Sequence, residues 1–114
     1  MAAFANYRKE NGLIFISGQL PIEADGEISQ ASIKDQTTLI LNHIVDAAKA
    51  EGVTKEDVIK TAVYTTDVDA VSEINAAYEE FFTNTKPTRS LFGVTGLVRG
   101  AKLEIDAVMK APEA

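Results

Sequence analysis

The sequence predicts an α+β domain in which two helices pack on one face of a mixed β-sheet. Three observations lead to this class. Short stretches rich in β-branched residues occur near the start, in the middle and at the end of the chain, and two longer stretches repeat their apolar residues at helical spacing. The elements follow the order strands, helix, strand, helix and two strands. The 114 residues contain no internal repeat and no linker, so we expect one domain over residues 1–114.

The first part of the chain predicts a hairpin. Residues 4–9 alternate weakly, and Asn11-Gly12 is a strong turn signal. The continuous apolar run at residues 13–16 then predicts a strand that is buried on both faces. Ser17-Gly18-Gln19 interrupts this run, because a glycine within a strand marks a bulge or a close approach of the backbone to another group. Pro21 ends the regular pairing, since it has no N–H to donate.

The first helix is predicted to start at Ser32, whose hydroxyl can accept an unpaired backbone N–H. It should run to about Glu51, with Gly52 as its stop. His43 lies beside its apolar stripe, and we interpret this histidine as structural or solvent-facing.

A second helix follows Asp67 or Asp69, either of which can cap it, and should end near residues 83–84, before Pro87. Its apolar residues recur at helical spacing and predict a core-facing stripe of Val71, Ile74, Tyr78, Phe81 and Phe82. Asn75 falls between these positions, so we expect it at the margin of the buried face.

The remaining strands are residues 58–66, 88–95 and 101–110, and the turn at 96–100 joins the last two. If these last two strands pair as a hairpin, Arg89 and Glu104 project from the same face of the sheet.

The two helices cover only one face of the sheet. We therefore expect the opposite face to carry Arg89 and Glu104 beside Leu91 and Val108. Such a half-apolar face is poorly suited to water, so we expect the chain to associate with copies of itself.

Charge and composition narrow the possible functions. A formal net charge of −6 gives little general affinity for nucleic acid or an anionic membrane. No apolar run approaches the ~20 residues that cross a membrane. The absence of cysteine excludes disulfides and thiol nucleophiles, and a single histidine offers no cluster for a metal. We expect a cytoplasmic protein that acts on a small molecule, with no nucleic-acid or membrane partner.

One arginine and one glutamate are the candidate functional residues. Arg89 lies among small and apolar residues, where an unpaired charge is costly to bury. Glu104 is in the middle of the last strand. We interpret Arg89 and Glu104 as the two working residues of one site. The alternative is a solvated arginine on an edge strand and an ordinary surface glutamate.

Several segments, in the same order, resemble the reactive intermediate deaminase (Rid, YjgF-like) family over nearly the whole chain. The matching segments are Phe15-Ile16-Ser17-Gly18-Gln19-Leu20-Pro21, Gln36-Thr37, Asp57-Val58-Ile59-Lys60-Thr61, Val63-Tyr64-Thr65-Thr66-Asp67, Ile74-Asn75-Ala76-Ala77-Tyr78-Glu79-Glu80-Phe81-Phe82, Lys86-Pro87-Thr88-Arg89-Ser90 and Leu103-Glu104-Ile105-Asp106-Ala107.

The resemblance implies a chorismate-mutase-like fold, assembled as a homotrimer with active sites in the clefts between subunits. It implies hydrolysis of reactive enamines and imines, such as 2-aminoacrylate, to 2-oxo acids and ammonia, with no cofactor and no metal. Arg89 matches the family arginine that binds the substrate carboxylate, and Glu104 matches the glutamate that positions or activates water. Asn75 matches the family asparagine, and Ser17 and Gly18 match residues that line the pocket.

The sequence departs from the family pattern at three positions. Phe4 aligns with a tyrosine that lines the family site, although Tyr7 is near enough to replace it if the alignment shifts. Leu91 and Gly93 stand where many members have cysteine and glutamate. Loss of the tyrosine hydroxyl at Phe4 predicts weaker catalysis or a different substrate. Leu91 and Gly93 predict a more apolar pocket of different shape.

Two other functions compete with the deaminase. One is a non-catalytic or regulatory protein that uses the same arginine to hold a small carboxylic acid, and Phe4, Leu91 and Gly93 favour it slightly. The other is an RNA-cleaving or translation-inhibiting protein, a role of some relatives, which the negative charge and the lack of a basic stripe disfavour.

Overall fold

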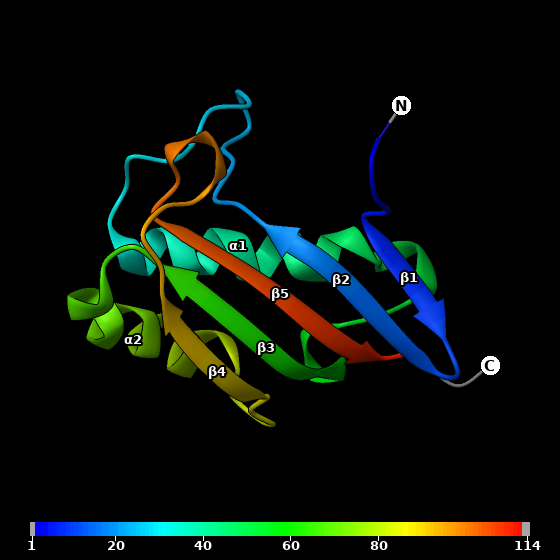
Figure 1. Ribbon diagram of the computed structural model, residues 1–114. Coiled ribbons are helices and arrows are strands. Elements are labelled where there is room, and N and C mark those ends of the chain that lie inside the picture. Colours follow the sequence, from blue (N-terminus) through cyan, green and yellow to red (C-terminus); the bar gives the residue numbers. More distant parts are fainter. Residues whose placement is uncertain (1, 113–114) are drawn as a thin grey trace.

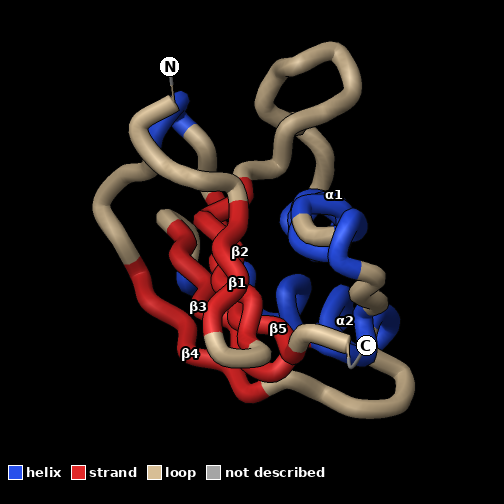
Figure 2. Tube along the Cα trace, turned by 90° about the vertical axis from the view of Figure 1, so that its right-hand side faces the viewer, coloured by secondary structure: helices blue, strands red, loops and turns tan. Residues whose placement is uncertain are grey.

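The computed structural model describes residues 2–112. This part of the chain forms one mixed sheet in the strand order β1-β2-β5-β3-β4, with both α-helices on one face (Figures 1 and 2). The α+β class with two helices on one face is therefore confirmed. The elements are β1 (Tyr7–Glu10), β2 (Leu13–Gln19), α1 (Ile33–Ala47), β3 (Val58–Thr65), α2 (Val71–Phe81), β4 (Thr88–Gly93) and β5 (Leu103–Lys110).

The predicted hairpin joins β1 and β2. Asn11 and Gly12 both have positive φ, 51° and 79°, as the tight turn requires. The register of β2 against β5 shifts between Ile16 and Gln19, which confirms the predicted break at residues 17–19. Burial on both faces of β2 is wrong, because Ile16 is buried under the helices while Phe15 is 48% exposed on the other face.

The last two strands do not form a hairpin, and this prediction is wrong. β3 lies between them, antiparallel to β5 and parallel to β4. A parallel pair needs a crossover connection, and α2 supplies it between β3 and β4. The chain then crosses the end of the sheet and enters β5 on the far side of β3 (Figure 1).

The core lies between the sheet and the helices. Its largest fully buried side chains come from both helices, from β2 and β5 and from the end of α2, and they include Phe82, Ile14, Ile40, Leu41, Ile44, Ile74, Leu103, Ile105 and Met109. Burial of this apolar surface fixes both helices on the sheet.

The helix ends differ in detail from the prediction. The Ser32 hydroxyl caps α1 by accepting the Asp35 N–H at 3.1 Å. α1 ends at Ala47, and a short 3₁₀ turn over Lys49–Glu51 continues to Gly52, whose φ of 81° terminates it.

The start of α2 also differs, because a 3₁₀ turn over Val68–Ala70 precedes it. Asp67 caps this turn, and α2 itself has no side-chain cap. α2 ends at Phe81, slightly before the predicted end. Within residues 2–112, none of the helices combines the length and apolar character that crossing a bilayer requires.

Candidate functional site

Arg89 and Glu104 lie on opposite faces of the sheet, so the expectation that they share a face is wrong. Arg89 is in register with Thr61 of β3, which is fully buried under the helices. Glu104 is in register with Tyr64, three residues further along β3. Residues in register share a face and successive residues alternate, so an odd separation along β3 places the two on opposite sides.

We call the face away from the helices the open face, and it carries Phe15, Tyr64, Phe92, Glu104, Asp106 and Val108. Leu91, which was expected there, is on the helix side with Arg89 and packs against the core. The insertion of β3 between β4 and β5 causes both differences.

Two side chains of α2 hold Arg89. Its Nη2 donates to Asn75 Oδ1 at 2.7 Å, and its guanidinium carbon lies 4.8 Å from the centre of the Tyr78 ring. Asn75 and Tyr78 are three residues apart on the helix, so both face β4. The structure therefore brings together Arg89 and Asn75, two residues that match site residues of the family that the sequence resembles.

Arg89 lines a pocket of about 360 Å³, and the walls come from α2, the segment before β4 and the start of β4: Asn75, Tyr78, Glu79, Lys86, Pro87 and Arg89. Lys86 donates from Nζ to the Phe82 carbonyl at 2.9 Å, which folds its chain along the pocket wall. Two cations and one carboxylate give the pocket a net positive charge. A guanidinium in such a setting suits a planar carboxylate, because its fork can bind both oxygens.

Glu104 forms a second group of residues on the open face. It lies against Gly18, where a built Cβ would overlap with the carboxylate of Glu104. Gly18 is within the irregular end of β2, and the lack of a side chain allows this close approach. The structure thus brings Gly18 and Glu104 together, and both were predicted site residues.

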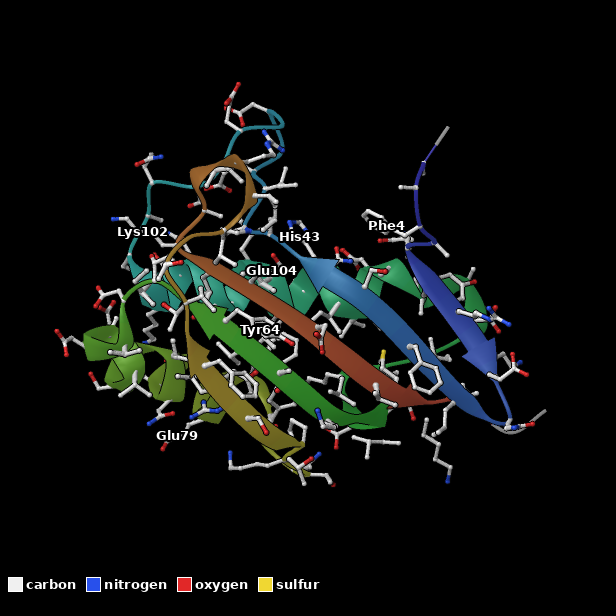
Figure 3. The ribbon with its side chains drawn as sticks, in the orientation of Figure 1. Phe4, His43, Tyr64, Glu79, Lys102 and Glu104 are labelled. Carbon is white, nitrogen blue, oxygen red and sulfur yellow. The ribbon has the colours of Figure 1, made fainter. Side chains whose placement is uncertain are left out.

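The surroundings of Glu104 disfavour its charge. Partial burial is the main cause that raises the pKa of its carboxyl, and the charge of Asp106, two residues on along the same face, raises this pKa further. Tyr64 lies beside it on β3 (Figure 3) and donates from its hydroxyl to Asp106 Oδ2 at 3.1 Å. A carboxyl with a raised pKa is a stronger base than an ordinary carboxylate, which suits it to accept a proton from water.

Ser17 and Phe4 belong to the N-terminal part of the fold. The Ser17 hydroxyl donates to the Ala5 carbonyl at 2.6 Å and ties the segment before β1 to β2. Phe4, on that segment, is 71% exposed and lies above the start of β1, apart from Glu104 (Figure 3). Within this chain, Phe4 therefore lines neither group.

Tyr7 does not take the place of the family tyrosine. Its hydroxyl donates to Glu51 Oε2 at 2.9 Å, and its register partner on β2 is the buried Ile16. Tyr7 thus points to the helix side, away from Glu104.

Leu91 and Gly93 follow Arg89 along the helix side of β4. Leu91 is partly buried against the core. A Cβ at Gly93 would come within 2.7 Å of Val68 Cγ1, so a side chain fits there only if Val68 moves. The family glutamate at this position is therefore incompatible with the present position of Val68.

Sequence reasoning treated Tyr78 as core alone and did not single out Thr61. The helical spacing of Asn75 and Tyr78 was the available signal, since it places both on one side of α2. Their meeting with Arg89 depends on the parallel pairing of β4, which the sequence pattern did not indicate.

Comparison with known proteins gives a match over nearly the whole chain. Residues 1–111 match the family model described as endoribonuclease L-PSP. The chain is 30% identical to Protein HMF1 of Saccharomyces cerevisiae over 107 residues, which cover 94% of this chain and 83% of that protein. It is 38% identical to the putative reactive intermediate deaminase TdcF of Escherichia coli K12 over 100 residues, which cover 84% of this chain and 77% of that protein.

Solved structures share the fold. The structure of E. coli TdcF with bound serine superposes with a TM-score of 0.89 and 33% identity, covering 98% of this chain and 91% of that one. The E. coli YjgF gene product gives a TM-score of 0.89 at 29% identity, with the same coverage. A Thermotoga maritima protein described as a putative endoribonuclease gives 0.90 at 29% identity, with 99% and 90% covered.

Proposed function

The chain belongs to the YjgF/RidA family, which is also described as endoribonuclease L-PSP or RutC, and from this premise we propose that it hydrolyses reactive enamines and imines. The products are 2-oxo acids and ammonia, and 2-aminoacrylate is a representative substrate. The observation that carries the proposal is the guanidinium of Arg89, which Asn75 and Tyr78 hold and which lines a positively charged pocket. Serine, the ligand of E. coli TdcF, has the carboxylate that such a group binds.

The complete site forms between copies of the chain. Arg89 and Glu104 are on opposite faces of one sheet, so one copy does not bring them to the same substrate. Phe15 and Phe92, each 48% exposed on the open face, supply apolar surface for association. A homotrimer, in which the Arg89 group of one copy meets the Glu104 group of the next, satisfies both observations.

In the proposed reaction, 2-aminoacrylate first takes a proton from water at its terminal carbon and becomes the iminium form of a 2-imino acid. Arg89 binds the carboxylate of this species and orients its imine carbon. Glu104 accepts a proton from a water molecule as its oxygen attacks this carbon. Glu104 returns this proton to the nitrogen of the resulting carbinolamine, ammonia leaves, and the hydroxyl gives its proton to solvent as the carbon–oxygen bond becomes the ketone of the 2-oxo acid. Water and imine are consumed in equal amounts, and no electron transfer occurs, so the reaction needs no redox cofactor. We place this activity in the cytoplasm.

The test is a coupled assay in which 2-aminoacrylate is generated in situ and product release is followed. Wild type should release the 2-oxo acid faster than buffer, and Arg89→Ala should lose most of this gain. Arg8→Ala is the matched control, because the Arg8 side chain is 78% exposed and belongs to β1, at the opposite edge of the sheet from Arg89 on β4. If the wild-type protein released the 2-oxo acid no faster than buffer alone, this result would contradict the proposed enzymatic function.

A second candidate is a non-catalytic protein that binds a small carboxylic acid. The apolar Leu91 favours it, because Leu91 stands where many family members have cysteine, two residues after Arg89 on the same side of β4, and leaves the contacts of Arg89 with Asn75 and Tyr78 intact. Pyruvate binding without turnover in the same preparation would decide for this candidate.

A further inference from the structure

The buried Tyr78 links Arg89 to the core of the protein. Its ring faces the guanidinium of Arg89, and its hydroxyl is hydrogen-bonded to Thr61 Oγ1 at 2.7 Å. Tyr78 is 8% exposed and Thr61 is fully buried. Thr61 is also the register partner of Arg89 on the neighbouring strand. The ring therefore spans two adjacent strands and is fixed at its far end.

This arrangement defines the position of an otherwise mobile side chain. The side chain of an unrestrained arginine samples many rotamers. This conformational freedom must be lost before the arginine can bind a ligand in one geometry. Asn75 accepts one of the five N–H groups of the guanidinium, and the Tyr78 ring supports its face. The remaining N–H groups stay available for a carboxylate in the pocket.

Acid–base chemistry does not account for Tyr78. Burial raises the pKa of its phenol to about 12, although the Thr61 hydrogen bond and the charge of Arg89 both lower this pKa. The phenol therefore stays protonated at neutral pH, and its hydroxyl is already used by Thr61. Tyr78 therefore contributes to the pocket through the face of its ring, which contacts Arg89.

We propose that Tyr78 is a positioning residue that holds Arg89 in the geometry for binding a substrate carboxylate, and that Thr61 fixes Tyr78. This inference rests on the proposed function, because it assigns the carboxylate to Arg89. It adds a residue whose effect on binding passes entirely through Arg89.

The test measures pyruvate affinity by calorimetry on wild type, Tyr78→Leu and Tyr78→Phe. Loss of the ring in Tyr78→Leu should weaken binding about 2- to 30-fold, the range expected for a lost cation–π contact. Tyr78→Phe keeps the ring and should retain most of the affinity. Phe81→Leu is the matched control, because Phe81 is an aromatic of the same helix that lies beneath Lys55. It should bind pyruvate as wild type does.

A double variant separates positioning from general damage to the fold. If Tyr78 acts through Arg89, adding Tyr78→Leu to Arg89→Ala should cause no further loss of pyruvate affinity. A further loss in the double variant, or wild-type affinity in Tyr78→Leu, would overturn the inference.

A second readout needs no ligand. The Tyr78 ring should shift the NMR signals of the Arg89 side-chain protons upfield, and Tyr78→Leu should abolish the shift while Phe81→Leu preserves it. Wild type that fails to bind pyruvate contradicts the proposed function. The NMR comparison still decides the present inference in that case, since unshifted Arg89 signals in wild type would overturn it.

Discussion

The residues around Arg89 and those around Glu104 have opposite effects on the charged side chain that they contact. Arg89 is bound by Asn75 and Tyr78 of α2 and is ready to hold a carboxylate. The surroundings of Glu104 have the opposite effect, because burial and Asp106 both raise its pKa and disfavour its charge. The contrast suggests a division of work, in which a preorganised arginine binds and a reactive carboxyl performs proton transfer.

Removal of the Glu104 carboxyl should have the largest effect on turnover. Glu104→Gln is nearly isosteric, so assembly should be unchanged and pyruvate affinity should change much less than the rate. General acid/base groups contribute about 10²- to 10⁴-fold, so we expect a loss of at least about tenfold in turnover of 2-aminoacrylate. The rate of 2-oxo acid release, with light scattering on the same sample, checks this. Undiminished turnover in the variant would show that another group activates water.

Removal of the Arg89 guanidinium should mainly weaken the binding of pyruvate. Arg89→Ala loses a charge-assisted contact of about 1.5–3 kcal/mol, or about 10- to 150-fold in pyruvate affinity. Arg89→Lys should recover only part of this, because lysine lacks the planar fork. Calorimetry with pyruvate gives all three values. Equal affinity in wild type and Arg89→Ala would show that the carboxylate binds elsewhere.

A methyl group at Gly18 should disturb Glu104 and leave Arg89 intact. The Cβ of Gly18→Ala would overlap with the carboxylate of Glu104, which must then move. Turnover should fall several-fold, by less than in Glu104→Gln, while pyruvate affinity stays near the wild-type value. Gly96→Ala is the control, because a Cβ at Gly96 meets nothing within 4 Å. A parallel fall in rate and affinity would contradict the separation of the two groups.

Substitution of Gly93 by alanine should lower the free energy of unfolding of the protein. Gly93→Ala brings a Cβ to within 2.7 Å of Val68 Cγ1, and such overpacking costs about 1–3 kcal/mol. Adding Val68→Ala should recover part of this free energy of unfolding, since Val68 is 53% exposed and its side chain can be removed at little cost. Denaturant unfolding of the single and double variants checks the coupling. Strictly additive effects would mean that the contact is relieved in another way.

The smallest expected effect concerns pH. Because the charge of Asp106 raises the pKa of Glu104, Asp106→Asn should lower that pKa. In the proposed reaction Glu104 acts in its charged form, so activity should fall as pH falls through its pKa. The acid limb of the pH–rate profile should therefore move to lower pH in the variant. The rate at high pH should change little. An acid limb that stays in place would show that another group controls it.

Local features were readable from the sequence because they depend on neighbours in the chain. Asn11-Gly12 predicted the hairpin, Ser32 predicted the start of α1, and Gly18 predicted the break in β2. Each signal reflects a preference of backbone or hydrogen bonding over a few residues. The candidate residues Arg89 and Glu104 were likewise found from their local contexts in the last two strands.

The relation between Arg89 and Glu104 was decided only by the tertiary structure. Alternation assigns residues to two faces within one strand, but the pairing of strands sets which faces coincide. β3 inserts between β4 and β5, and its register partners Thr61 and Tyr64 place the two residues on opposite sides. The same pairing brings Tyr78 beneath Arg89. Such contacts join segments distant in the chain, and the burial of a shared core selects them, so no local pattern could predict them.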